Sequence, residues 1–283
     1  MIAHPTSADC ALLVLTCDSY SDLWTPFFKL LERHWPDRPF PLYLGAGAAT
    51  FDSPAVTMLR SNAGRDWSQC VIEYLDQLPQ RQVLILLDDF FLRRRVDTSA
   101  VMRCLAFSRT KQATQLRLVS RPGPTGRFPE DDLIGECAAG SPYRLSMQAA
   151  IWDRAKLREL LRAGESIWEF EHNGNSRATG QPGGFYSVWR SVLPYEGFFA
   201  HHVVEKGRWF FHERWIFTRQ NIGCDFTRRD TLPAGQTAFY HLAQLLDRSL
   251  NPLGWRAKSA IKRRLRRWLD PLIGRQLQRL GRP

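Results

Sequence analysis

Two adjacent acids stand where an apolar run ends. Residues 82–87 read QVLILL, and Asp88 and Asp89 follow directly. A continuous apolar run is typical of a strand buried on both faces of a parallel sheet. Two neighbouring carboxylates at the end of such a strand repel each other and are costly to bury alone. We therefore expect a positive charge to meet them, and a divalent cation is a partner that carboxylates bind well.

The same two acids also have a purely structural interpretation. One could cap the following turn while the other pairs with Arg93 or Arg94. Asp18, near the end of the first apolar run, favours the functional interpretation. In open α/β sheets ligands bind at the carboxyl ends of the strands, where all three aspartates would lie.

A second group of acids alternates with aromatic residues in WEFE, residues 168–171. In a strand, Glu169 and Glu171 would lie on the same face. An apolar neighbourhood raises the pKa of a carboxyl group and makes it a better general base near neutral pH. An exposed acidic turn, or a carboxylate paired with Arg177, explains the same residues equally well.

Two later residues are candidates for ligand contacts. His202 could supply a late metal ligand, and Lys206 could hold a phosphate. Their ordinary interpretations are a structural histidine among aromatic residues and a solvated surface charge.

The elements that must position these residues alternate along the chain. The patterns predict strands at 11–20, 39–46, 55–61, 82–92 and 116–120, and helices at 21–35, 66–78 and 98–110. Glycine-rich and proline-rich loops are expected at 121–142 and 172–186, with a helix or a strand plus helix at 143–161. Strands alternating with helices predict a layered α/β domain with a mostly parallel sheet.

The positive charge of the chain is concentrated in one segment. The net charge is +11, and residues 251–283 hold ten Lys or Arg against one acid, which gives +9. Trp255 and Trp268 fall on an apolar helical stripe in this segment, with basic residues elsewhere around it. This pattern predicts a helix lying on an anionic membrane surface. A helix packed on the domain and a nucleic-acid patch are the alternatives, and we expect no nucleic-acid partner because the remaining residues carry only +2.

Composition limits the other classes. Six scattered cysteines without a CxxC pair predict neither a disulfide framework nor a structural zinc site. We expect neither an export signal nor a membrane span, because no apolar run is long enough. A cytoplasmic protein, peripheral at the inner face of the cytoplasmic membrane, is the expected location.

Four stretches together resemble bacterial glycosyltransferases with a GT-A-like nucleotide-sugar domain, including enzymes of polysaccharide and lipopolysaccharide loci. The stretches are LLVLTCDSYSDLW, GRDWSQCVIEYLDQLPQRQVLILLDDFFL, YRLSMQAAIWDRAKLRELLRAGESIWEFE and HHVVEKGRW. In that family an apolar strand ends in an acidic metal-binding motif usually written DxD. Here the motif is LDDFF, with the two aspartates adjacent.

The resemblance implies a role for each candidate. Asp88 and Asp89, with His202, would hold Mn²⁺ or Mg²⁺, and Asp18, Asp88 and Lys206 would contact the donor. Arg65, Asp66 and Trp67 would contact the base or diphosphate, although Asp66 equally suits a helix N-cap. Glu171 would be the general base, with Glu169 as the substitute. These assignments are expectations that the resemblance supplies.

The expected fold is a GT-A-like (Rossmann-like) α/β domain over residues 1–250, with a basic amphipathic tail at 251–283. The nucleotide-binding half would span about 1–120 and the acceptor half about 140–220. The expected activity is transfer of a sugar from a nucleotide-sugar donor to a glycan or lipid-linked acceptor in bacterial envelope polysaccharide synthesis. The alternatives are a noncatalytic scaffold that docks on membrane or nucleic acid, and a metal-dependent nucleotidyl or phosphoryl transferase.

Overall fold

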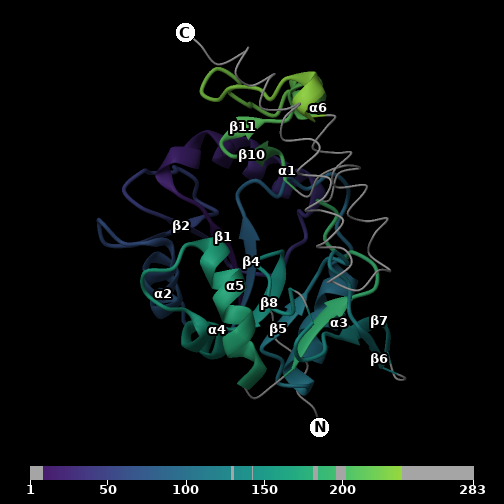
Figure 1. Ribbon diagram of the computed structural model, residues 1–283. Helices are drawn as coiled ribbons and strands as arrows, with labels where there is room; N and C mark the ends of the chain where they lie inside the picture. Colours follow the sequence, from purple (N-terminus) through teal and green to yellow (C-terminus); the bar gives the residue numbers. More distant parts are fainter. Residues whose placement is uncertain (1–8, 129–130, 142, 181–183, 196–201, 238–283) are drawn as a thin grey trace, which may run out of the picture. The chain divides into compact units, whose positions relative to one another are not determined.

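The expected alternation of strands and helices produces one mixed sheet with helices on both faces (Figure 1). A computed structural model describes residues 9–128, 131–141, 143–180, 184–195 and 202–237. The chain divides into two compact units, Met1–Leu232 and Pro233–Pro283, and all the elements below belong to the first. The predicted basic tail at 251–283 lies outside the described residues.

The sheet contains nine strands in the described part of the chain, in the spatial order β3-β2-β1-β4-β8-β5-β9-β7-β6. In chain order they are β1 (Cys10–Leu15), β2 (Leu42–Ala46), β3 (Thr57–Arg60), β4 (Gln82–Leu87), β5 (Gln115–Arg117), β6 (Gly126–Phe128), β7 (Asp131–Glu136), β8 (Ala150–Asp153) and β9 (Phe185–Val188). Strands β7 and β8 run opposite to the other seven. The prediction of a mixed, mostly parallel sheet flanked by helices is therefore confirmed.

Helices and a small hairpin complete the unit. They are η2 (Asp18–Leu23), α1 (Trp24–His34), α2 (Trp67–Gln77), α3 (Thr98–Thr110), α4 (Arg154–Leu160), α5 (Ile167–Arg177), η3 (Ala178–Gly180), the hairpin β10 (Val204–Glu205) and β11 (Arg208–Trp209), and α6 (Phe211–Gln220). None of the described helices is long and apolar enough to cross a membrane.

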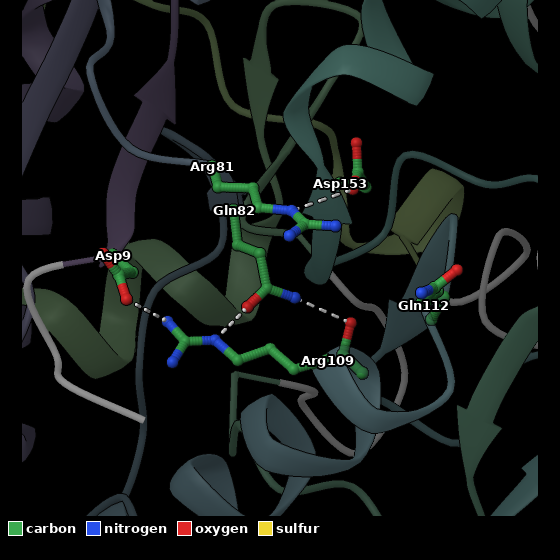
Figure 2. A pocket seen from close by; sticks show the side chains of 8 residues that line it. Asp9, Arg81, Gln82, Arg109, Gln112 and Asp153 are labelled. Carbon is green, nitrogen blue, oxygen red and sulfur yellow. Dashed lines mark hydrogen bonds and ion pairs between the residues drawn. The ribbon is translucent and has the colours of Figure 1, made fainter. Parts of the chain in front are cut away.

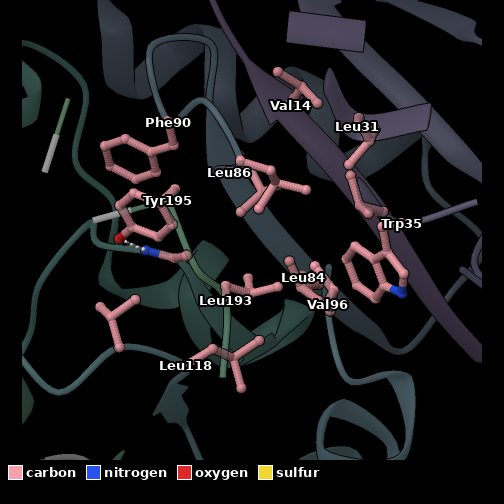
Figure 3. Close-up of a cluster of buried hydrophobic side chains, with 14 of the residues drawn as sticks. Val14, Leu31, Trp35, Leu84, Leu86, Phe90, Val96, Leu118, Leu193 and Tyr195 are labelled. Atoms are coloured by element: carbon pink, nitrogen blue, oxygen red, sulfur yellow. Dashed lines mark hydrogen bonds between the residues drawn. The ribbon is translucent and has the colours of Figure 1, made fainter. Parts of the chain in front are cut away.

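Successive residues of β1 supply two separate cores because side chains of a strand alternate between its faces. Leu12 and Val14 pack with buried residues of α1, α3 and α6, whereas Leu13 and Leu15 pack with α2, α4 and α5. Figure 3 shows part of the first core, where Leu84 and Leu86 of β4 lie between the α1 side chains and Tyr195. Each fully buried leucine stabilises the fold by about 1.5–3 kcal/mol.

Several predicted elements differ from the observed ones, including the loop expected at 172–186, which contains the end of α5 and the start of β9. The first strand ends at Leu15, and η2 follows because a tight turn begins at Cys17, whose carbonyl accepts from the Tyr20 N–H at 2.9 Å. The loop expected at 121–142 contains the antiparallel pair β6 and β7. The WEFE segment is helical, within α5, so its expected strand geometry is wrong. Ser166 starts that helix with a capping box, a local signal that outweighs the alternation of residues.

Candidate functional site

The strand order creates a switch point between β1 and β4. The chain moves from β1 through β2 to β3 in one direction, and β4 then lies on the other side of β1. Ligands in open α/β sheets bind in the crevice outside the carboxyl ends of strands at such a point. Thr16 follows β1 there, and Asp88 and Asp89 follow β4.

The Asp88 carboxyl group is held by a hydrogen bond from a residue that follows β1. Its Oδ2 accepts a hydrogen bond from the Thr16 hydroxyl, and that hydroxyl oxygen accepts one from Trp24 Nε1 at 2.8 Å. Burial and the neighbouring Asp89 charge raise the pKa of Asp88 well above its ordinary value, against the Thr16 hydrogen bond. The indole donor directs the Thr16 proton toward Asp88, so Thr16 fixes this carboxylate.

Asp89 presents a different carboxylate. Its Oδ1 is buried and has no hydrogen-bond partner in the part of the chain that the structure describes. Burial raises the pKa of Asp89 to about 6, while the charge of His202 acts to lower it. A buried oxygen without a donor is a costly feature unless a ligand or ion completes it.

The segment after residue 201 brings positive charge to the two acids. His202 Nε2 lies 2.9 Å from Glu205 Oε2, and the Val203 N–H donates to the Asp89 carbonyl at 3.2 Å. Burial disfavours the charged imidazole, but the Glu205 hydrogen bond and the charges of Asp89 and Glu205 raise the pKa of His202 above its ordinary value. The structure thus brings together three predicted residues, Asp88, Asp89 and His202.

A buried ion pair that the sequence did not reveal joins the same segment to η2. Arg229 Nε and Nη2 donate to the two oxygens of Asp22, both at 2.7 Å, and the guanidinium lies 3.9 Å from the centre of the Tyr20 ring. The Arg229 and Asp22 side chains are 7% and 2% exposed. Arg229 also contributes a favourable charge at Asp88 and Asp89.

We expect Asp22→Asn to lower the free energy of unfolding by about 3–5 kcal/mol, because it leaves the buried Arg229 guanidinium without its counter-charge. Chemical denaturation of the variant and the parent measures the difference. Asp76→Asn is the matched control, since it breaks an exposed pair with Arg158 and should change stability by about 1 kcal/mol or less. Equal losses of stability from the two substitutions would contradict a buried Asp22–Arg229 ion pair.

Asp18 lies at the end of β1, as expected, but its oxygens are engaged. They accept hydrogen bonds from the backbone N–H groups of Gly47 and Ala48 at 3.0 and 2.8 Å. A Cβ at Gly47 would approach Asp18 Oδ2 to 2.9 Å, so a glycine is required for this contact. Asp18 therefore ties the segment after β1 to the loop after β2. Among the described residues, no hydrogen bond joins it to Asp88 or Asp89.

The three residues before the second helix have structural partners. Asp66 is the N-cap of α2, in a capping box with Gln69, and also accepts from the Gly164 N–H at 2.9 Å. Arg65 pairs with Glu73 at 2.7 Å. Trp67 packs on Phe170 with ring centres 5.6 Å apart. The N-cap interpretation of Asp66 is confirmed, and the donor contacts of Arg65, Asp66 and Trp67 stay predictions.

The helical geometry of α5 separates the two WEFE acids. Glu169 is exposed and closes the capping box by accepting from the Ser166 N–H at 2.8 Å, and this hydrogen bond lowers the pKa of Glu169. Glu171 points to the other side, where its Oε1 accepts from the Met147 N–H at 2.6 Å and the Ser146 hydroxyl at 3.1 Å. Burial raises the pKa of Glu171 despite those donors.

The residues that bond Glu171 place it relative to the ends of the strands. Met147 and Ser146 come shortly before β8, which is antiparallel to β4 and pairs Ala150 with Ile85. The residues before Ala150 therefore lie toward the carboxyl end of β4, the end that carries the two aspartates. Of the two WEFE acids, only Glu171 is partly buried, held by hydrogen bonds and near the carboxyl end of β4.

Lys206 occupies a tight turn. It joins β10 to β11 together with Gly207, and their φ values are +49° and +78°, as in a two-residue hairpin turn. Lys206 is exposed. Its predicted phosphate contact stays a prediction.

The predicted cation has a partial set of ligands. Within the described ranges, no group of three or more His, Cys, Asp or Glu side chains is arranged to hold a metal ion. The buried Asp89 Oδ1 without a donor fits one carboxylate bond to a cation. Divalent cations at phosphate sites commonly take one or two carboxylates and complete their shell with phosphate oxygens and water.

One cavity, of about 170 Å³, opens at the other end of the strands, where β1 and β4 begin. Figure 2 shows its charged side chains bonded to one another: Arg109 contacts Asp9 and Gln82, and Arg81 pairs with Asp153. Asp9 and Arg81 precede β1 and β4, and Gln82 begins β4. Asp153 ends the antiparallel β8, and Arg109 lies in the last turn of α3. The cavity is thus remote in topology from the two strand-end aspartates, and its polar groups satisfy each other.

No protein-family model and no curated protein matches the chain. Several solved structures are distantly similar, among them TarS, LgtC and a cytidylyltransferase. S. aureus TarS 1–349 in complex with UDP is 15% identical with a TM-score of 0.40, over 86% of this chain and 72% of that one. The galactosyltransferase LgtC, in complex with donor and acceptor sugar analogues, is 11% identical with a TM-score of 0.36, over 61% and 67%.

A cytidylyltransferase from Leptospira borgpetersenii is 12% identical with a TM-score of 0.35, over 59% of this chain and 69% of that one. In a second TarS structure the match covers 60% of the TarS chain. TM-scores this low carry no inference about activity, so function has to be argued from the site itself.

Proposed function

We propose that the chain is a GT-A-like glycosyltransferase that moves a sugar from a nucleotide-sugar donor to a glycan or lipid-linked acceptor. The observation that carries the proposal is the aspartate pair at the β1–β4 switch point, with Asp88 held by Thr16 and a buried Asp89 oxygen that has no donor among the described residues. A site of this kind suits a negatively charged donor that arrives together with a cation.

Asp89 would hold Mn²⁺ or Mg²⁺, joined by His202 once its imidazole has lost its proton, with Asp88 positioned beside them. When bound, such an ion neutralises the negative charge that develops on the leaving nucleoside diphosphate. The protein's own residues supply orientation: Thr16 and Trp24 fix Asp88, and Arg229 adds positive charge to the same edge.

Glu171 is the proposed general base for the acceptor hydroxyl. Its carboxylate is partly buried and desolvation raises its pKa, which increases its basicity near neutral pH. Met147 and Ser146 hold only Oε1, and Oε2 accepts no hydrogen bond from the described residues. One oxygen is thus fixed while the other remains able to take a proton.

We expect nucleotide sugars to raise the melting temperature of the full chain when Mn²⁺ is present. The physical reason is that a ligand that binds only the native state stabilises it, by about 2.7 kcal/mol at a hundred times its dissociation constant. A thermal-shift panel of nucleotides and nucleotide sugars, with Mn²⁺, with Mg²⁺ and with chelator, measures this.

Product analysis then separates the reaction classes. Release of a nucleoside diphosphate indicates glycosyl transfer, whereas release of pyrophosphate indicates nucleotidyl transfer. A folded sample that no nucleotide stabilises would refute the proposal and favour the noncatalytic scaffold.

We also propose an envelope role, with the protein peripheral at the inner face of the cytoplasmic membrane. The support is the sequence of residues 251–283, which carry +9 of the +11 net charge together with an apolar stripe. A lipid-linked acceptor would then be presented at the surface where the tail binds.

A further inference from the structure

Helix α6 directs an unusual set of side chains outward. The exposed residues Phe211, Arg214, Trp215, Thr218 and Arg219 follow the spacing i, i+3, i+4, i+7 and i+8, so they form a single stripe, called here the α6 stripe. Phe211 and Trp215 are 53% and 59% exposed. Aromatic residues normally take the buried stripe of a surface helix, and here they take the solvent stripe.

The opposite side of α6 fixes this orientation. Glu213 is buried and receives a two-pronged hydrogen bond from Arg93, with Nη1 to Oε2 at 3.1 Å. Phe217 packs in the core against Phe91, with ring centres 5.2 Å apart. Rotation of the helix to hide its aromatic residues would break both contacts, so the α6 stripe is held facing outward.

The charges on the stripe have one sign. The guanidinium of Arg219 lies 3.6 Å from the centre of the Trp215 ring, and Arg214 donates to Thr231 Oγ1 at 3.4 Å. Neither arginine forms an ion pair within the described ranges, and the stripe contains no acid. Figure 1 shows α6 beside β10 and β11. This hairpin follows Val203, whose N–H donates to the Asp89 carbonyl.

We infer that the α6 stripe docks on the surface of an anionic lipid bilayer. Aromatic rings are favoured at the boundary between headgroups and acyl chains, and arginines beside them complement anionic headgroups. The charge of the stripe selects an anionic surface over a neutral one. The inference concerns a different segment from the tail at 251–283, and it does not depend on the proposed activity.

The test measures binding of the full-length protein to vesicles of phosphatidylcholine with about one third phosphatidylglycerol, a content chosen to give a negative surface. Two double variants are compared with the parent: Phe211→Ser/Trp215→Ser and Arg214→Gln/Arg219→Gln. Trp168→Ser is the matched control, because Trp168 is 76% exposed on α5 and lies outside the stripe. We expect each double variant to bind at least tenfold more weakly and the control to bind like the parent.

Four outcomes would overturn the inference. Parent-like binding by both double variants would assign docking to another segment. A parent protein that ignores the vesicles would remove the lipid partner. A concentration-dependent dimer lost in the double variants would make the partner a second copy. A lower melting temperature in the double variants, with vesicle binding increased, would show that another part of this chain covers the stripe.

Discussion

We expect Asp89→Asn to reduce sugar transfer by about 10³-fold or more while leaving the protein folded. Asp89 Oδ1 is buried and has no donor among the described residues, so this oxygen is open to a ligand. Asparagine has the same shape but no charge to offer a cation. Initial rates with a nucleotide-sugar donor, and Mn²⁺ binding by calorimetry, measure the loss.

Asp88→Asn is the matched comparison for this variant. Asp88 Oδ2 already accepts from Thr16, so the amide oxygen can preserve that contact and metal-dependent nucleotide binding should weaken less. If Asp88→Asn loses Mn²⁺ binding and Asp89→Asn keeps it, the roles are reversed. Parent-like turnover by Asp89→Asn would remove the aspartate pair from the mechanism.

The stability of the Asp89 variant should depend on pH in a defined direction. The folded pKa of about 6 lies above the ordinary value of 3.8, so ionising this carboxyl in the fold costs free energy. The cost is absent below about pH 4, grows as the pH rises to about 6 and persists above that. Asp89→Asn should therefore gain stability over the parent at pH 7, on the order of 1–3 kcal/mol, and little at pH 4. Urea unfolding of the variant and the parent at both pH values measures the difference in their free energies of unfolding. The same difference at pH 4 and pH 7 would contradict a charged Asp89 that is buried in the fold.

We expect Glu171→Gln to lower kcat by about 10²–10⁴-fold and to leave donor affinity nearly unchanged. The amide oxygen can still accept from Met147 and Ser146, so the local structure is preserved while proton transfer is lost. Single-turnover kinetics and nucleotide binding separate the two effects.

The other acid of the same motif is its control. Glu169→Gln retains the capping box, because glutamine serves at that helix position as well as glutamate. It should keep the parent's activity and stability. If both variants lose activity equally, or if Glu171→Gln fails only in donor binding, Glu171 is not the base.

Much of the layered fold could be predicted because long apolar runs and helical spacing are strong local signals. The helix at 98–110 has the predicted bounds, and Asp66 caps α2 as its residue type favoured. The WEFE segment failed because four residues cannot distinguish alternation in a strand from one helical turn. The decisive residues, Ser166 and Glu169, form a capping box whose first member lies outside the motif.

The aspartate site was only partly predictable from the sequence. The position of Asp88 and Asp89 after a buried strand was readable, and so was the need for a positive charge near them. The Asp22–Arg229 pair was not, because its residues are 207 positions apart and each has an ordinary neighbourhood in the sequence. Thr16, two residues before Asp18, carried no signal of its own until Trp24 was seen to orient its hydroxyl.

The long span of that ion pair bears on how the protein is made. During synthesis a ribosome adds about 5–20 residues each second, so Asp88 and Asp89 emerge on the order of ten seconds before Arg229 does. Until then the carboxyl ends of β1 and β4 carry their acids without the Arg229 charge. Closing a contact of such sequence separation is also slow for a chain of this size. The electrostatic environment of the site is therefore complete only after the segment around Arg229 has been synthesised and has reached η2.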